Sequence, residues 1–146
     1  MWIKVENDAD ISTLMDTVDY FHDSCLKEMK YSSGAYVDHE LYMNPINELR
    51  VLSIVFQRQS HKNSVVVLEF RKLKYVKLFP LSENYTCEIL DATLLYDSGV
   101  FYWCDCGGLS RSDMDMHRGV VICAEELYWK STDNFLGRCD YFQEHT

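Results

Sequence analysis

The sequence predicts an α+β fold that is predominantly antiparallel β. We expect one short N-terminal helix followed by a curved antiparallel sheet or a partly closed barrel or sandwich. Three observations predict it: one early segment has helical spacing of its apolar residues, most later segments have apolar residues at every second position, and short turns connect them. The later segments are not separated by helical patterns, which disfavours a parallel α/β arrangement.

The helix is predicted by apolar residues three or four positions apart, which share one helix face: Ile11, Leu14, Met15 and Val18. Asn7, Asp8 and Asp10 supply an acceptor and negative charge near its start, where backbone N–H groups are free. We expect the helix to end near Asp19.

Strands are predicted where apolar residues alternate, because one face of a sheet is then buried. The alternating sets are Val37, Leu41 and Met43, then Leu52, Ile54 and Phe56, then Val66, Leu68 and Phe70. After Arg71 and Lys72 the phase slips, and Leu73, Tyr75 and Phe79 continue the pattern. This predicts a bulge near Arg71.

A hairpin is predicted between residues 87–96 and 100–105, because Asp97, Ser98 and Gly99 form a turn sequence with a glycine available for positive φ. The last strand is predicted over residues 119–130, with Val121, Cys123, Leu127 and Trp129 on one face.

The length and composition favour a single domain over residues 1–146, in which residues 134–146 form a loosely ordered tail. The formal net charge is −9. Such a charge repels nucleic acid and anionic membranes and attracts basic proteins. We therefore expect no nucleic acid or membrane partner, and a basic protein is the favoured partner; the oligomeric state stays open.

The location is predicted to be cytoplasmic, because the N-terminus lacks the pattern of a secretory signal and the apolar runs are strand-sized. The chain contains 6 Cys. Thiols stay reduced in the cytoplasm, so we expect most of these cysteines in the core and none in a disulfide.

The first candidate site is His22 with Asp23, an imidazole beside a carboxylate where the predicted helix gives way to strands. This pair can serve as a general base or as metal ligands. The alternative is structural, since neighbours in a strand point to opposite faces and short polar side chains often bind nearby backbone groups.

A second candidate is a metal site with Cys104, Cys106 and His117, completed by Cys123. Zinc prefers thiolate and imidazole ligands, although its usual cysteine pairs have two or more residues between them. The alternative is that these thiols are core residues, and we expect no cofactor.

A third candidate comprises Asp113, Asp115 and His117. In an extended chain these alternate positions point the same way and can bind a cation. The alternative is a solvated acidic loop.

Surplus aromatic residues are the fourth feature, since 14% of the chain is Phe, Trp or Tyr. Tyr102 and Trp129 are candidate binding residues, together with Tyr31, Tyr36, Tyr42 and Tyr128. Tyr and Trp are enriched at interfaces, but they also cover sheet faces through cross-strand pairs.

Familiar enzyme motifs are missing from the sequence, including the phosphate-binding loop, the dinucleotide fingerprint and the nucleophile elbow. The sequence therefore favours a function without catalysis.

The segment Tyr20-Phe21-His22-Asp23-Ser24-Cys25-Leu26 resembles a Phe-His-Asp-Ser element that precedes a β-rich body in small uncharacterised bacterial proteins. Some of those proteins are thought to be immunity partners of toxins. The resemblance implies no catalytic residues.

Our first hypothesis is a non-enzymatic protein-interaction domain, in its more specific form an immunity-type inhibitor of a basic protein or toxin. The alternative is a small-ligand or metal-binding domain, or a hydrolase, that uses the His and Asp residues above. A third hypothesis is assembly through an exposed strand edge in residues 49–58.

Overall fold

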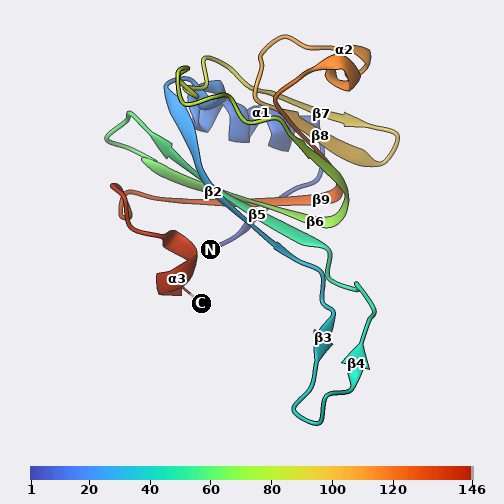
Figure 1. The fold of residues 1–146 in the computed structure, drawn as a ribbon. Coiled ribbons are helices and arrows are strands. Elements are labelled where there is room, and N and C mark those ends of the chain that lie inside the picture. The colour runs from blue at the N-terminus through green and yellow to red at the C-terminus, as the bar shows by residue number, and fades with distance from the viewer. Residues whose placement is uncertain (146) are drawn as a thin grey trace.

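A computed structural model describes residues 1–145, with side chains to residue 143. Its main feature is a seven-stranded antiparallel sheet in the order β2-β5-β6-β9-β8-β7, with β1 also paired to β9 (Figure 1). The strands are β1 (Ile3–Val5), β2 (Ser24–Ser32), β3 (Tyr36–Val37), β4 (Met43–Asn44), β5 (Val51–Arg58), β6 (Val65–Leu78), β7 (Thr93–Asp97), β8 (Val100–Cys104) and β9 (Val120–Thr132). The helices are α1 (Asp8–Thr17), the 3₁₀ turn η1 (Asp19–Phe21), α2 (Arg111–Met116) and α3 (Tyr141–His145).

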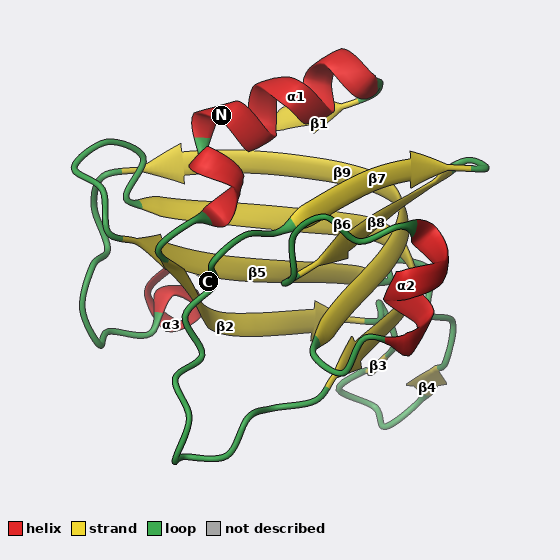
Figure 2. Cartoon of the chain, turned by 90° about the horizontal axis from the view of Figure 1, so that it is seen from above, coloured by secondary structure: helices red, strands yellow, loops and turns green. Residues whose placement is uncertain are grey.

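The N-terminal helix α1 confirms the prediction. The Asn7 side chain accepts a hydrogen bond from the Asp10 backbone N–H at 2.9 Å, so Asn7 is the N-cap. Leu14 and Met15 face the sheet and are buried, and Val18 is the C-cap. Figure 2 shows α1 beyond β9, at one side of the neighbouring strands β9, β6, β5 and β2.

The core lies between α1 and one face of the sheet. Two predicted alternating sets are confirmed as part of it, namely Leu52, Ile54 and Phe56 of β5 and Val66, Leu68 and Phe70 of β6. All six side chains are at most 2% exposed.

The sheet is strongly curved. The rings of Phe56 in β5 and Trp103 in β8 lie 5.2 Å apart, although β6 and β9 separate these strands. Phe21 packs on both rings, at 4.8 and 5.6 Å. This aromatic cluster fills the concave side of the sheet.

The curvature stops short of a closed barrel. Within residues 1–145, β2 and β7 are the two edge strands of this order. An isolated bridge joins Ser24 at the start of β2 to Ile89, which precedes β7. The prediction of a mostly antiparallel sheet with a short N-terminal helix is confirmed, and among the described residues the sheet is not closed.

Strand β6 bends at the predicted place. Lys72 has a φ of +54°, and the pairing with β9 changes register between Leu73 and Tyr75. The continuation of one face through Leu73, Tyr75 and Phe79 is wrong, however. Leu73 packs on the main core, Tyr75 packs with Val121 on the opposite face, and Phe79 lies beyond the end of β6.

Strand β9 also changes phase. Leu127 and Trp129 belong to the main core, whereas Val121 lies in a separate cluster with Cys104 and Met114. The prediction that Val121 shares a face with Leu127 and Trp129 is therefore wrong. The change falls where β9 stops pairing with β8 at Ala124 and begins pairing with β1 at Leu127.

The predicted hairpin is confirmed as β7 and β8. Ser98 and Gly99 form its two-residue turn with φ values of +52° and +85°. Both residues have positive φ, as a type I′ turn requires. Strand β7 begins at Thr93, later than predicted.

The chain after β9 covers the second face of the sheet. Tyr141 is buried against Val55, Val65 and Val67, with Phe135 and Phe142 beside them. The Gln57 side chain donates hydrogen bonds to the backbone oxygens of Phe135 and Gly137, both at 3.0 Å. Thr146, the end of the predicted tail, lies outside the described residues.

Residues 33–50 leave the sheet between β2 and β5 and form a projecting hairpin, which we call the arm (Figure 1). Strands β3 and β4 pair within it. The prediction that Val37, Leu41 and Met43 form a buried strand face is wrong, because these side chains are exposed. Strand β5 is also not a free edge, since it pairs with β2 and β6.

No helix within residues 1–145 has the length and apolar character needed to cross a membrane. The cysteines are all free. Cys104 and Cys123 are buried, Cys25 and Cys106 are half-buried, and Cys87 and Cys139 are exposed. The expectation that most of them lie in the core is wrong.

Candidate functional site

His22 and Asp23 lie at the junction between η1 and β2. The His22 Nδ1 atom is 2.6 Å from the Leu90 backbone oxygen, and its Nε2 atom is 3.4 Å from Asp23 Oδ2. The Leu90 carbonyl, followed by the Asp23 carboxylate, raises the pKa of His22 above its ordinary value of 6.5. This imidazole holds the segment before β7 against the start of β2.

The backbone of this junction is left-handed over several non-glycine residues. Asp19, Tyr20, Phe21 and Asp23 have φ values of +51°, +53°, +61° and +56°. Each such residue costs roughly 1–2 kcal/mol. The buried ring of Phe21 in the aromatic cluster and the bond from Asp23 N–H to the Ile89 oxygen, at 3.0 Å, hold the conformation.

A pocket of about 430 Å³ opens beside Asp23. It is lined by Asp23, Ser24, Cys25, Gln57, Arg58, Gln59, Glu88 and Leu136. Ser24 Oγ and Arg58 Nε are buried and have no hydrogen-bond partner among the described residues. Arg58 Nη1 is engaged, because it donates to the backbone oxygens of Lys62 and Asn63 at 3.2 and 2.7 Å.

Helix α2 contains Asp113 and Asp115, so these residues do not lie in an extended chain as predicted. The Asp113 carboxylate accepts from the Ser110 backbone N–H at 3.2 Å in a capping box, and Ser110 lowers the pKa of Asp113. Asp115 accepts from Arg111 at 2.7 Å. Each carboxylate therefore has its own partner within the helix, and the two do not converge with His117.

His117 pairs with Asp105 instead. Its Nε2 atom is 2.6 Å from Asp105 Oδ1, which also accepts from the Val120 backbone N–H at 3.1 Å. Gly119 makes room for this pair. A Cβ atom at Gly119 would lie 2.4 Å from His117 Nε2 and 2.6 Å from Asp105 Oδ1.

Cys104 is the thiol beside this pair. It is completely buried at the end of β8, and burial raises its pKa to about 11. The ligand atoms of Cys104, Asp105 and His117 all lie within 4.8 Å of one another. Cys106, predicted as a third member, is outside this group, and its Sγ lies 3.8 Å from the Gly107 backbone oxygen.

The two predicted aromatic binding residues have different surroundings. Trp129 is 5% exposed and lies in the main core, so it offers no binding surface. Tyr102 is half-buried beneath Arg111, whose guanidinium carbon is 4.0 Å from the ring centre. Tyr102 also hydrogen-bonds Cys123, although burial dominates and raises the pKa of Cys123.

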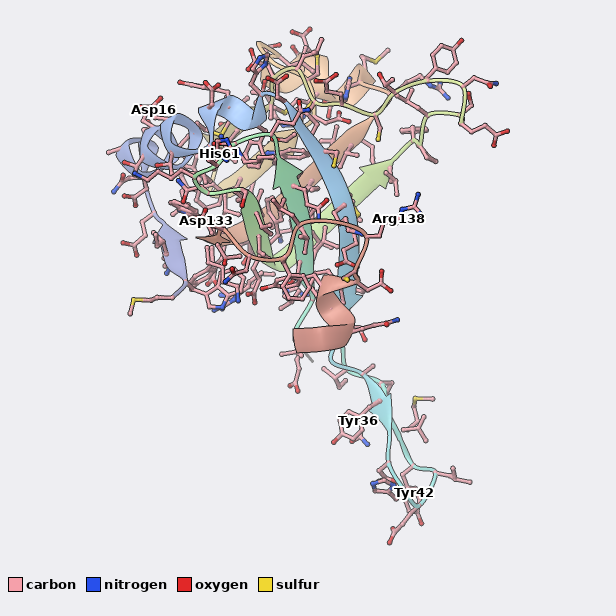
Figure 3. All side chains as sticks on the ribbon, turned by 90° about the vertical axis from the view of Figure 1, so that its left-hand side faces the viewer. Asp16, Tyr36, Tyr42, His61, Asp133 and Arg138 are labelled. Carbon is pink, nitrogen blue, oxygen red and sulfur yellow. The ribbon has the colours of Figure 1, made fainter. Side chains whose placement is uncertain are left out.

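The arm carries a group of exposed apolar side chains, of which only Tyr36 and Tyr42 were candidate binding residues from the sequence. The group comprises Tyr36, Val37, Leu41, Tyr42, Met43, Ile46 and Leu49, from 50% to 83% exposed. Tyr36 and Tyr42 lie far from the body of the molecule (Figure 3). The signal in the sequence that could have indicated this exposed segment is a run of apolar residues that is interrupted by charges, Gly34 and Pro45 and does not keep the spacing of a strand.

The arm is nevertheless ordered by its own hydrogen bonds. At the tip, Asp38 Oδ1 accepts from the backbone N–H groups of Glu40 and Tyr42 at 2.9 and 3.0 Å. At the base, the backbone N–H groups of Leu49 and Arg50 donate to the Ser33 oxygen. Gly34 lies beside this base with a φ of +98°, and a Cβ there would lie 2.9 Å from the Leu49 nitrogen.

The arm is also acidic. It contains Asp38, Glu40 and Glu48 against a single Arg50. Arg50 belongs to the base, where its backbone oxygen accepts from Leu73 N–H at 3.0 Å at the bend of β6. The projecting part therefore combines apolar side chains with carboxylates.

Comparison with protein-family models finds no match. Comparisons with curated proteins and with solved structures find no significant similarity. The structure described here defines the class as a mostly antiparallel β fold with few helices.

Proposed function

We propose that this chain is a non-enzymatic protein-interaction domain that acts in the cytoplasm and binds a basic protein through the arm. The observation that carries the proposal is the exposure of seven apolar side chains on one ordered projection. Exposed apolar side chains gathered on one element are typical of protein interaction sites.

The arm has the properties of a preorganised binding element. Its tip and base hydrogen bonds fix the backbone before any partner arrives, so less conformational entropy is lost on binding. Tyr36 and Tyr42 supply large rings with few rotatable bonds, which are favoured at interface hot spots.

Charge favours a basic partner. The carboxylates of Asp38, Glu40 and Glu48 accompany the apolar residues, and the whole chain has a formal net charge of −9. Opposite charge on the partner would speed encounter and fix its orientation. In its more specific form, the proposal is an immunity-type inhibitor of a basic toxin, supported by the resemblance at Phe21, His22, Asp23 and Ser24.

The small-ligand hypothesis has weaker support. His22 and Asp23 contact the segment before β7, whereas Asp113, Asp115 and His117 have partners around α2. The pocket beside Asp23 includes only one of these five residues. The exposed arm therefore carries the proposed function.

The test compares partner capture by tagged wild-type protein and by the triple variant Leu41→Ser, Tyr42→Ser and Met43→Ser. We expect one stoichiometric basic protein with the wild type and its loss with the variant, measured by quantitative mass spectrometry. The matched control is Leu81→Ser with Tyr85→Ser, two side chains that are 58% and 70% exposed on another loop. Equal capture by the arm variant would contradict the proposal.

The partner's chemistry is tested with the purified pair. Its affinity should fall severalfold between low and high ionic strength, because salt screens exposed charges. An affinity that is independent of salt concentration would contradict the proposal that the partner is basic. If the partner is a toxin, the wild type should abolish its toxicity on co-expression and the arm variant should not.

A further inference from the structure

Three residues of different chemistry meet where β8 ends and α2 leads into β9. Cys104 is the last residue of β8, Asp105 follows it, and His117 is the C-cap of α2. A thiol, a carboxylate and an imidazole with ligand atoms within 4.8 Å of one another form a set of donors that zinc accepts.

The surrounding backbone fixes two of these residues. Asp105 is joined to β9 in both directions, because its N–H donates to the Val120 oxygen at 3.2 Å and its carboxylate accepts from the Val120 N–H at 3.1 Å. The His117 N–H donates to the Met114 oxygen at 3.3 Å. Met114 is itself fully buried beside Cys104, so α2 is anchored next to the thiol.

Gly119 lets the His117 and Asp105 side chains lie close to the backbone. Any side chain there would overlap both His117 Nε2 and Asp105 Oδ1, at 2.4 and 2.6 Å from its Cβ atom. The His117 and Asp105 side chains therefore pack directly against the Gly119 backbone, just before the start of β9.

We propose that Cys104, Asp105 and His117 bind a zinc ion, with solvent as the fourth ligand. A thiolate and a carboxylate together balance the charge of Zn²⁺, which suits a buried position. The side chains of His117 and Asp105 are 22% and 28% exposed, which gives the ion and the fourth ligand a route from solvent.

The required movement is small. Zinc bonds of about 2.0–2.3 Å place tetrahedral ligand atoms roughly 3.3–3.8 Å apart. The ligand atoms now lie up to 4.8 Å apart, so the widest separation must shorten by about 1 Å. The 2.6 Å distance from His117 Nε2 to Asp105 Oδ1 must lengthen by about the same amount. The ion replaces that hydrogen bond with two metal bonds.

The test is a titration of the full chain with Co²⁺ under reducing, anaerobic conditions. The exposed thiols are first removed by Cys87→Ser and Cys139→Ser. We expect one equivalent to produce visible bands of tetrahedral cobalt and a thiolate-to-cobalt charge-transfer band, both abolished by added Zn²⁺. Absence of the charge-transfer band would overturn the proposal.

Variants then assign the ligands. Cys104→Ser should remove the charge-transfer band, and His117→Ala or Asp105→Asn should weaken Co²⁺ affinity by at least about tenfold, the scale of losses even for groups that only support a ligand. Cys106→Ser and Cys123→Ser are the matched controls and should keep the band. Circular dichroism checks that each variant folds. If Cys104→Ser unfolds, Asp105→Asn still tests the site, because asparagine has nearly the same shape as aspartate. A band that survives Cys104→Ser, or one lost with Cys106→Ser, would contradict the assignment.

Discussion

His22 shows how one side chain joins distant parts of this chain. Its imidazole sits between its neighbour Asp23 and the backbone oxygen of Leu90, 68 positions further along the sequence. His22 and Asp23 are recognisable as a pair in the sequence. Leu90 is not, because a backbone acceptor 68 positions away leaves no mark in the residue pattern.

The pKa of His22 is the first prediction. Its pKa is raised in the folded chain, so the folded state holds the proton more tightly than the unfolded state. The stabilisation is fully present below about pH 6.5 and is lost as the pH rises through the folded pKa. NMR titration of the ring should give a value above 6.5.

The variant Asp23→Asn separates the two causes of this shift. It should lower the pKa of His22 only in part, because the Leu90 carbonyl is the larger cause and remains. His22→Gln should flatten the dependence of the unfolding free energy on pH in this window. A His22 pKa at or below 6.5 would contradict the structure.

Burial of single residues was the least predictable property at this scale. Trp129 and Tyr102 both look like surface aromatics in an alternating strand, yet Trp129 lies in the core and Tyr102 lies beneath Arg111. Both faces of the sheet are covered, one by α1 and the other by α2 and the C-terminal segment. Alternation alone cannot say which face is buried when both are.

At the scale of elements, α1 and the β7–β8 hairpin were predictable because their signals are local. The Asn7 cap and the Ser98-Gly99 turn need only neighbouring residues. The arm was not predictable in this way. Val37, Leu41 and Met43 are evenly spaced, as in a buried strand, although the rest of the arm does not keep this spacing. The pairing of Ser32 with Val51 beneath the arm shows that the sheet continues without it.

The second prediction concerns the tip of the arm. Asp38→Ala removes the acceptor of two backbone N–H groups, those of Glu40 and Tyr42. Hydrogen exchange at these amides should accelerate by about fivefold, since each such bond contributes about 1 kcal/mol. The global unfolding free energy should change by less than about 0.5 kcal/mol, because the tip lies outside the core.

Glu40→Ala is the matched control for this prediction. It removes an exposed carboxylate at the same tip and leaves the two hydrogen bonds in place. Its exchange rates should match the wild type. Equal acceleration in both variants would show that tip charge, rather than the Asp38 hydrogen bonds, orders the arm.

At the scale of the whole molecule, the sheet has a different cover on each face. Helix α1 and the Phe21–Phe56–Trp103 cluster fill the concave face, and residues 134–143 lie on the other. The antiparallel class followed from the sequence, because short turns and alternation are local. Closure did not, because it depends on whether β2 and β7 meet, and these strands are about 60 positions apart along the chain.

The third prediction is that the C-terminal cover stabilises the sheet. A chain ending after Asp133 would expose the Val55, Val65 and Val67 face on which Tyr141 and Phe142 pack. We expect a loss of roughly 2–4 kcal/mol in unfolding free energy, from one or two aromatic side chains. Denaturant unfolding measures the loss, and binding of a hydrophobic dye should increase.

Leu136→Ser is the control for the truncation, because this side chain is 56% exposed. It should leave stability close to that of the full chain. A truncated chain as stable as the wild type would mean that this cover contributes nothing to the fold.

The position of the arm has a consequence for how such a protein can diverge. Ser32 and Val51 are paired neighbours, so the arm departs from and returns to one point of the sheet. Lengthening or shortening an excursion of this kind costs little closure entropy. The arm between residues 33 and 50 can therefore vary in length and sequence while the sheet and its core stay the same.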